Sequence, residues 1–139
     1  MNESVENSNE QFKYPDISAE SGELERVARE LGVELSVLEH QAQSGELVPL
    51  DSNVWEILEN TDSNDIETGG FELVQRLSFQ VGRNWKDIKE KMDSGKALDA
   101  PIVVKFGNRY HLVSGNTRLM VSKAKGVTPK IFLFEIDLA

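Results

Sequence analysis

The last third of the chain carries the clearest alternation of apolar and polar positions. Residues 102–106 form an apolar run rich in β-branched side chains, and residues 110–114 form a second run of the same kind. Gly107 and Asn108, which favour tight turns, lie between the two runs. The pattern therefore predicts a β-hairpin.

A helix and a further strand are predicted after this hairpin. The apolar spacing from Asn116 to Lys125 is helical, and Gly126 is the kind of residue at which a helix ends. We expect the Asn116 side chain to cap the first turn by accepting a backbone hydrogen bond. Residues 130–137 alternate again and predict a strand. Because strand–helix–strand connections favour a right-handed crossover, we expect strands 110–114 and 130–137 to be parallel.

Short helices dominate the first half of the chain. Helical spacing covers 21–31 and 36–43, and an edge strand at 46–50 precedes a helix at 51–59. The first two helices have the spacing of a helix-turn-helix, but the second offers no Lys or Arg with which to contact DNA phosphates. We therefore expect helix packing or partner docking here rather than DNA reading.

The centre of the chain reads as a loop followed by two helices. Residues 60–70 are polar and end in two glycines. These acidic side chains do not form an EF-hand loop, because Gly and Glu are absent from the positions at which such a loop requires them. We therefore predict no metal site. Both helix and strand fit 71–81, and we favour a helix. Asn84 then caps a clearer helix that extends to about Ser94.

The same pattern divides the chain into three parts. Residues 1–20 are rich in Asn, Ser and Glu and poor in apolar side chains, so we expect a disordered acidic tail. Residues 21–75 form an acidic helical extension that packs on the core or leads into it. Residues 76–139 form that core, and the predicted fold class is mixed α/β.

Charge is distributed unevenly between these parts. Residues 1–75 contain 18 acidic and 3 basic side chains, a net charge of −15, whereas residues 76–139 contain 6 acidic and 12 basic ones, a net charge of +6. The overall charge of −9 disfavours nonspecific coating of DNA, although the C-terminal part can hold an anion. The acidic half could occupy a basic surface on a protein partner, or simply attract the basic half.

Length and composition limit the class of protein. A chain of 139 residues that is 39% apolar suits one globular domain. No apolar run is long enough to span a membrane and no secretory signal is recognisable, so we expect a cytoplasmic protein. The absence of Cys excludes disulfides and the common zinc motifs.

A strand-to-helix junction with the sequence Ser-Gly-Asn-Thr-Arg is the candidate functional site. The first amides of the predicted helix would point together, with the positive end of the helix dipole behind them. Gly115 allows close backbone approach, the Thr117 hydroxyl adds a donor, and the Arg118 guanidinium adds a fork suited to phosphate. The predicted phosphate-binding or nucleotide-binding residues are Ser114, Gly115, Asn116, Thr117 and Arg118.

Other interpretations of these residues stay open at this point. The junction could be a purely structural cap, with Arg118 paired to an acidic residue such as Asp137. His111 lies inside a strand, where a packed histidine is the expectation over a general base. Glu56 or Glu59 could reach a substrate as a base, although a solvated helix face is the commoner role. No catalytic residue can be named from the sequence.

The order of the C-terminal segments resembles the ParB/sulfiredoxin superfamily. The resemblance covers roughly residues 85–136, under half of the chain. It rests on Pro-Ile-Val-Val at 101–104, on Tyr-His-Leu-Val-Ser-Gly-Asn-Thr-Arg at 110–118 and on Ala-Lys-Gly-Val at 124–127. It implies a small domain with a hairpin, a phosphate-binding corner, a helix and a strand.

The corner itself matches the family motifs in part. Gly115 and Arg118 match the Gly and the second Arg of the ParB motif Gly-Glu-Arg-Arg-x-Arg-Ala, whereas the positions between them differ. The free-serine-kinase branch, with Asp-Gly-His-Thr-Arg, also matches Thr117, but has Asp and His where Ser114 and Asn116 stand. Sulfiredoxins use a Cys in this corner, and this chain has none, so sulfiredoxin chemistry is excluded.

The resemblance and the charge distribution together leave three alternative functions open. The first is a ParB-like domain that binds a nucleotide such as ATP or CTP with Mg²⁺, as a nucleotide hydrolase or phosphotransferase. The second is a ParB-like nuclease or DNA-associated regulator. The third is a non-catalytic adaptor or inhibitor that uses its acidic half to bind a basic partner. Because such domains are widespread on phages and plasmids, the resemblance also favours a mobile element as the source.

Overall fold

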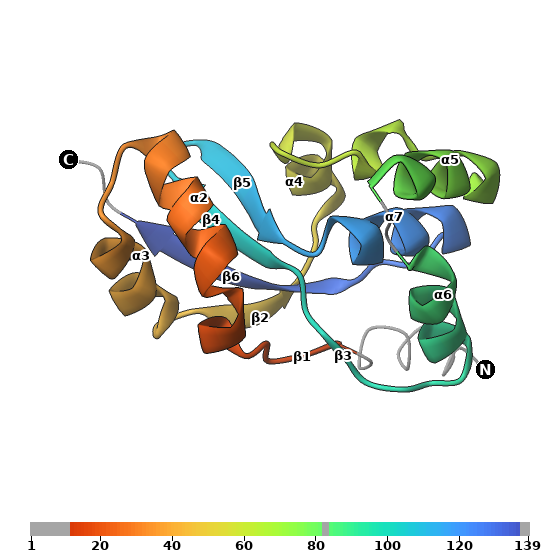
Figure 1. The fold of residues 1–139 in the computed structure, drawn as a ribbon, viewed down its shortest axis with the longest axis horizontal. Helices are drawn as coiled ribbons and strands as arrows, with labels where there is room; N and C mark the ends of the chain where they lie inside the picture. Colours follow the sequence, from red (N-terminus) through yellow and green to blue (C-terminus); the bar gives the residue numbers. More distant parts are fainter. Residues whose placement is uncertain (1–11, 82–83, 137–139) are drawn as a thin grey trace.

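A four-stranded mixed sheet forms the centre of the computed structural model, which describes residues 12–81 and 84–136 (Figure 1). The strand order is β2-β6-β4-β5. These strands are β2 (Glu46–Pro49), β4 (Ile102–Phe106), β5 (Arg109–Ser114) and β6 (Lys130–Ile136). The strands β4 and β5 pair antiparallel, which confirms the predicted hairpin. The mixed α/β class is confirmed as well.

The predicted pairing of the last strand is wrong. β6 pairs parallel to β4, not to β5, and β5 is antiparallel to β4. The physical reason is the apolar character of β4, in which Ile102, Val103 and Val104 are at most 1% exposed. Such a strand is most stable with a neighbour on each side, so β4 takes the position between β5 and β6. The parallel connection therefore leads from β4 to β6 through β5 and the following helix.

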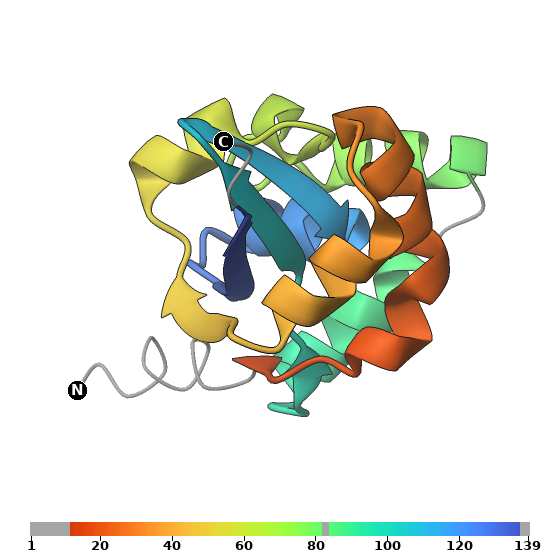
Figure 2. The same cartoon turned by 90° about the vertical axis from the view of Figure 1, so that its left-hand side faces the viewer.

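Both faces of the sheet are covered by apolar side chains from helices. On one face, Ile102 and Val104 pack against α2 (Ser21–Leu31) and α3 (Leu35–Ala42). On the other face, Val103 packs against a cluster that contains Trp55 of α4 (Ser52–Ile57). Figure 2 shows α2 and α3 on one side of the sheet and α4 on the other. Trp55 is a core residue, as expected, with 6% exposure.

The remaining helices lie at one end of the sheet. The helices α5 (Phe71–Val81) and α6 (Trp85–Asp93) both pack against α7 (Asn116–Lys125). The helix favoured for 71–81 is therefore confirmed, and Asn84 caps α6 through a hydrogen bond that its side chain accepts from the Asp87 amide. A turn of 3-10 helix, η2 (Ser63–Asp65), lies in the predicted loop.

The N-terminal segment is ordered from an earlier residue than the sequence predicts. Residues 1–11 lie outside the described part of the chain, but β1 (Phe12–Lys13) pairs parallel to β3 (Leu98–Asp99). A short 3-10 helix, η1 (Ile17–Glu20), then leads into α2. Phe12 is 3% exposed and belongs to the main core, which offsets the entropy of ordering this segment.

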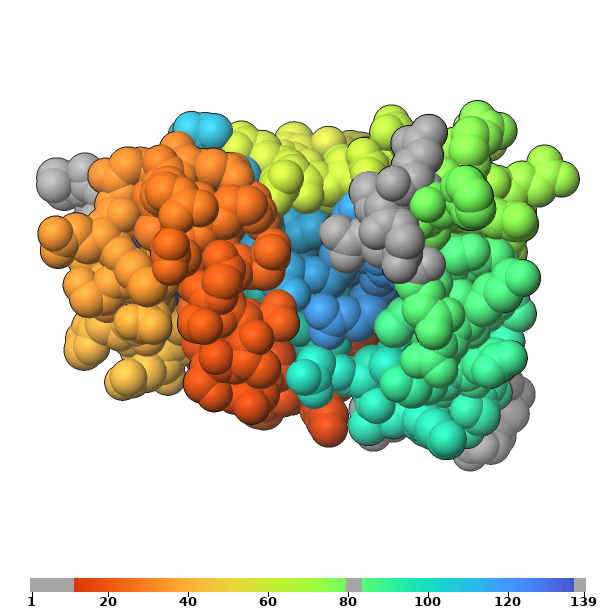
Figure 3. Space-filling model, viewed as in Figure 1, coloured from red at the N-terminus to blue at the C-terminus, as the bar shows by residue number. Residues whose placement is uncertain are grey.

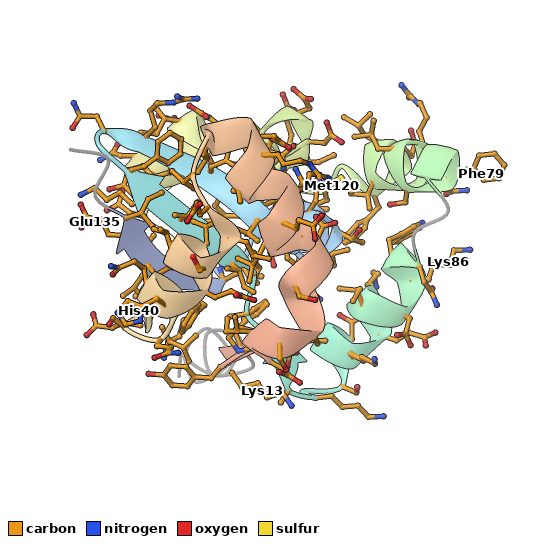
Figure 4. All side chains as sticks on the ribbon, turned by 60° about the vertical axis from the view of Figure 1, so that its left-hand side comes forward. Lys13, His40, Phe79, Lys86, Met120 and Glu135 are labelled. Carbon is orange, nitrogen blue, oxygen red and sulfur yellow. The ribbon has the colours of Figure 1, made fainter. Side chains whose placement is uncertain are left out.

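The two sequence-defined halves share one core. The boundary expected at 75/76 falls within α5, and the main cluster combines Leu24 and Val27 of α2 with Phe132 and Phe134 of β6. The exposed aromatic side chain Phe79 projects from α5 away from this core (Figure 4).

Candidate phosphate-binding site

The candidate corner is the short connection between β5 and α7. Its centre is Gly115, which has a φ of +109° and directly precedes α7. A Cβ atom at this position would lie 2.6 Å from Cβ and 2.7 Å from Cα of Pro101. Only glycine fits this backbone, because both the positive φ and the close approach exclude a side chain.

The expected cap of α7 by Asn116 is wrong. Its Oδ1 atom instead accepts hydrogen bonds from the Thr61 hydroxyl at 2.7 Å and from the Asp62 amide at 3.0 Å. These bonds tie the corner to the loop before η2. Within the described residues no side chain caps the first turn of α7. The positive end of this helix is consequently left to other partners.

The Thr117 hydroxyl is buried without a hydrogen-bond partner. Thr117 is 8% exposed, and its Oγ1 atom has no bonding partner in the described structure. A buried hydroxyl without a partner costs free energy, and native structures usually supply one. Thr117 lines a pocket of about 300 Å³ whose other polar residues are Asn84, Asp87, Ser114 and Arg118.

The Arg118 guanidinium lies across the same pocket. Its Nη1 atom donates to the backbone carbonyl of Asp99, and its Nη2 atom donates to the Ser114 hydroxyl at 3.4 Å. Its expected alternative partner Asp137 lies outside the described residues. The acidic member of the pocket, Asp87, forms a salt bridge of 3.1 Å with Lys91. The negative charge of Asp87 is thereby compensated.

A larger cleft adjoins this pocket. It has a volume of about 740 Å³ and shares Ser114 and Gly115 with the smaller pocket. Figure 3 shows a hollow between α2 on one side and α5 and α6 on the other, with the β5–α7 corner on its floor. The charged residues that line the cleft are Glu20, Glu23, Arg26, Glu30 and Asp62.

Arg26 holds the α2 wall of the cleft in place. Its guanidinium donates to Glu23 at 2.7 Å, to Glu30 at 2.5 Å and to the Val113 carbonyl at 3.3 Å. Partial burial lowers the pKa of Arg26, but the two carboxylates outweigh it, so the net shift of the pKa is upward. The residues of this α2 wall were not among the site residues predicted from the sequence. The one available signal was the spacing of Glu23 and Glu30 around Arg26 on one helix face.

A second group of polar side chains contacts the cleft residue Glu30. His111 is 6% exposed, and its two ring nitrogens lie 3.3 Å from Glu30 and 3.5 Å from Glu59. Glu59 also accepts two hydrogen bonds of 2.8 Å from Arg109, which lower its pKa against the opposing effect of burial. The expectation of a packed histidine is confirmed. Glu59 is neither a solvated helix residue nor a base with a free carboxylate, and Glu56 is exposed on α4.

Neither a metal centre nor a known relative identifies the ligand. The described residues contain no group of three or more His, Asp or Glu side chains placed to hold a metal ion. No helix in residues 12–81 or 84–136 is long and apolar enough to cross a membrane. No family model, no curated protein and no solved structure matches the chain. The ParB/sulfiredoxin expectation therefore stays a prediction that rests on the order of the sequence segments at 101–104, 110–118 and 124–127.

Proposed function

We propose that the β5–α7 corner binds the phosphate group of a small molecule or nucleotide. The observation that carries the proposal is the buried Oγ1 atom of Thr117, which has no partner among the described residues and stands at the uncapped start of α7. A bound phosphate oxygen would accept its hydrogen bond and remove the cost of burying it.

The backbone supports an anion at the same place. The first hydrogen bond of α7 runs from the Leu119 amide to the Gly115 carbonyl. The amides of Asn116, Thr117 and Arg118 precede it, so they belong to the helix end that carries positive partial charge. Helix starts of this kind bind phosphates, and Gly115 lets the ligand approach the backbone.

Arg118 provides the charged contact. It lines the pocket that Thr117 lines, so its guanidinium would meet a phosphate bound there. An arginine can bond two phosphate oxygens in parallel, which adds geometric specificity to affinity. The similarity of the corner to the phosphate-binding motif of ParB-like proteins agrees with this role.

Catalysis would need a carboxylate beside the bound phosphate. The structure offers Asp87 in the smaller pocket and Asp62 in the larger cleft. A nucleotide hydrolase or phosphotransferase with Mg²⁺ would use one of them to hold the ion or to orient the acceptor. Asp87 lies in the pocket itself and is paired with Lys91, whereas Asp62 lines the adjoining cleft and accepts a hydrogen bond of 3.5 Å from Asn116.

Binding to DNA has less support. The second helix of the helix-turn-helix spacing, α3, buries Leu38 and Ala42 in the main core and exposes Glu39. The cleft beside the corner is also acidic, which repels a nucleic acid backbone. A nuclease or DNA-associated regulator would need a different surface for contact with DNA. An adaptor that binds a basic partner through its acidic half would not use the pocket.

The experiment is a ¹⁵N NMR titration with inorganic phosphate, AMP, Mg-ATP and Mg-CTP. We expect the amide signals of residues 116–118 to shift and the melting temperature to rise with ligand concentration. Thr117→Val should weaken phosphate binding about tenfold, because it removes a hydrogen bond to a charged group and keeps the shape of the side chain. Thr128→Val, an exposed threonine outside the pocket, is the matched control. Unchanged affinity in Thr117→Val contradicts the proposal.

A further inference from the structure

The outer face of α5 carries the most exposed aromatic side chain in the described part of the chain. Phe79 is 86% exposed and points away from the core at the end of α5 (Figure 4). The packing of α5 on the domain uses the opposite face of the helix, where Val74 is buried and Leu77 is half-buried. Phe79 therefore contributes nothing to the core, and its ring is open to a partner.

Phe79 forms a shallow groove together with three polar residues of the same helix. The groove has a volume of about 380 Å³ and is lined by Glu72, Gln75, Arg76 and Phe79. Their spacing of three and four residues places them on one face of α5, and all four are exposed. The aromatic ring and the methylene groups of the long side chains give this face an apolar part between charged ends. Such a combination is typical of a contact surface between proteins.

The two charged residues of the groove do not pair with each other. A glutamate and an arginine at the same spacing on α2 do so, because Glu25 and Arg29 form a salt bridge of 2.8 Å. Among residues 12–81 and 84–136, neither Glu72 nor Arg76 forms a salt bridge. Both charges are therefore available to a group outside the chain.

This face is complementary to itself when two copies of the chain meet with antiparallel α5 helices. A twofold axis beside residue 74 brings Glu72 of each copy level with Arg76 of the other, because both residues lie about 3 Å along the helix from the axis. The same register brings Phe79 level with Gly69 of the other copy, which is exposed and has no side chain to block the ring. A partner surface with charges of one sign would instead repel either Glu72 or Arg76.

We propose that α5 is the contact surface of a weak homodimer with antiparallel α5 helices. Two reciprocal pairs of Glu72 with Arg76 set the register, and Phe79 supplies the apolar contact on each side. One helix face is smaller than the interface of a stable dimer, so we expect a dissociation constant on the order of 100 µM. The proposal makes no use of the β5–α7 corner and is therefore independent of the proposed function.

Sedimentation equilibrium of the full chain measures this association. We expect the average mass to rise from the monomer value towards the dimer value between about 10 µM and about 1 mM protein. A salt concentration of about 0.15 M screens the repulsion between two copies that each carry a net charge of −9. Phe79→Ser should weaken the association about tenfold, because it removes the apolar contact at an exposed position. Circular dichroism checks that the variant is folded.

A charge exchange tests the antiparallel register. Glu72→Arg alone and Arg76→Glu alone should both be monomeric, because each variant places like charges opposite each other twice. An equimolar mixture of the two variants should dimerise again, since the new arginine of one copy then meets the new glutamate of the other. Glu39→Arg makes the same change of charge at an exposed position outside the groove and should leave the association unchanged.

Three results would overturn the proposal. The first is an unmodified protein that stays monomeric up to about 1 mM, which would assign the α5 face to a different partner. The second is an association that Phe79→Ser leaves unchanged, which would place the contact on another surface. The third is a mixture of Glu72→Arg and Arg76→Glu that remains monomeric, which would exclude the antiparallel register.

Discussion

Replacing Gly115 with alanine tests the geometry of the corner directly. The residue has a φ of +109°, and an added Cβ would lie 2.6 Å from Cβ and 2.7 Å from Cα of Pro101. Pro101 cannot retreat easily, because its carbonyl accepts a hydrogen bond of 2.8 Å from the Phe132 amide. The alanine side chain therefore meets both an unfavourable backbone conformation and a fixed neighbour.

The expected cost has two parts. A left-handed backbone costs a residue with a Cβ about 1–2 kcal/mol. Forcing a methyl group into occupied space costs about 1–3 kcal/mol. The sum for Gly115→Ala is about 2–5 kcal/mol of unfolding free energy, a large fraction of the stability of a small domain.

A second glycine separates these two parts. Gly95 has a φ of +76°, but a Cβ added there would meet no heavy atom within 4 Å apart from those of its own chain neighbours. Gly95→Ala should therefore lose only the backbone contribution, about 1–2 kcal/mol. Urea denaturation of both variants, with equal m-values as the check for a common unfolded state, measures the difference. Equal losses in the two variants would refute the close approach of Gly115 to Pro101.

Three further predictions concern residues around the corner. Asn116→Ala should lower the unfolding free energy by about 0.5–1.5 kcal/mol in urea denaturation, because it removes the acceptor of hydrogen bonds from the Thr61 hydroxyl and the Asp62 amide. The pKa of Glu59 is lowered in the folded state, so the ionised carboxylate contributes to stability at neutral pH, and this contribution is lost as the pH falls below about 4.5. Arg109→Ala should therefore reduce the fall of the melting temperature between neutral and acidic pH. Trp55→Phe should cost about 0.5–1.5 kcal/mol in thermal unfolding, because the indole donates to Ser63 at 2.7 Å.

Local signals explain what the sequence could predict. The β4–β5 hairpin follows from Gly107 and Asn108 between two β-branched runs, and α6 follows from its Asn84 cap. The parallel partner of β6 could not be predicted from neighbouring residues, because it depends on which strand is buried on both sides. The two-residue strands β1 and β3 have no periodicity to detect.

Only the part of the candidate site that is formed by consecutive residues could be predicted from the sequence. The strand end, Gly115 and the start of α7 are consecutive in the chain, so their geometry follows from short-range rules. The bonds that shape the cleft join distant positions, such as Asn116 with Thr61 and Arg26 with Val113. No local pattern encodes such contacts, and the prediction that Asn116 caps its own helix failed for this reason.

The two halves of the chain, which differ in net charge, contribute different residues to the cleft and the corner. The acidic half supplies the wall with Glu20 and Asp62, and the basic half supplies the corner with Thr117 and Arg118. Because the main core combines side chains from both halves, the corner and the acidic wall belong to the same packed unit. The geometry of the corner therefore depends on the folding of the whole chain rather than on the corner motif alone.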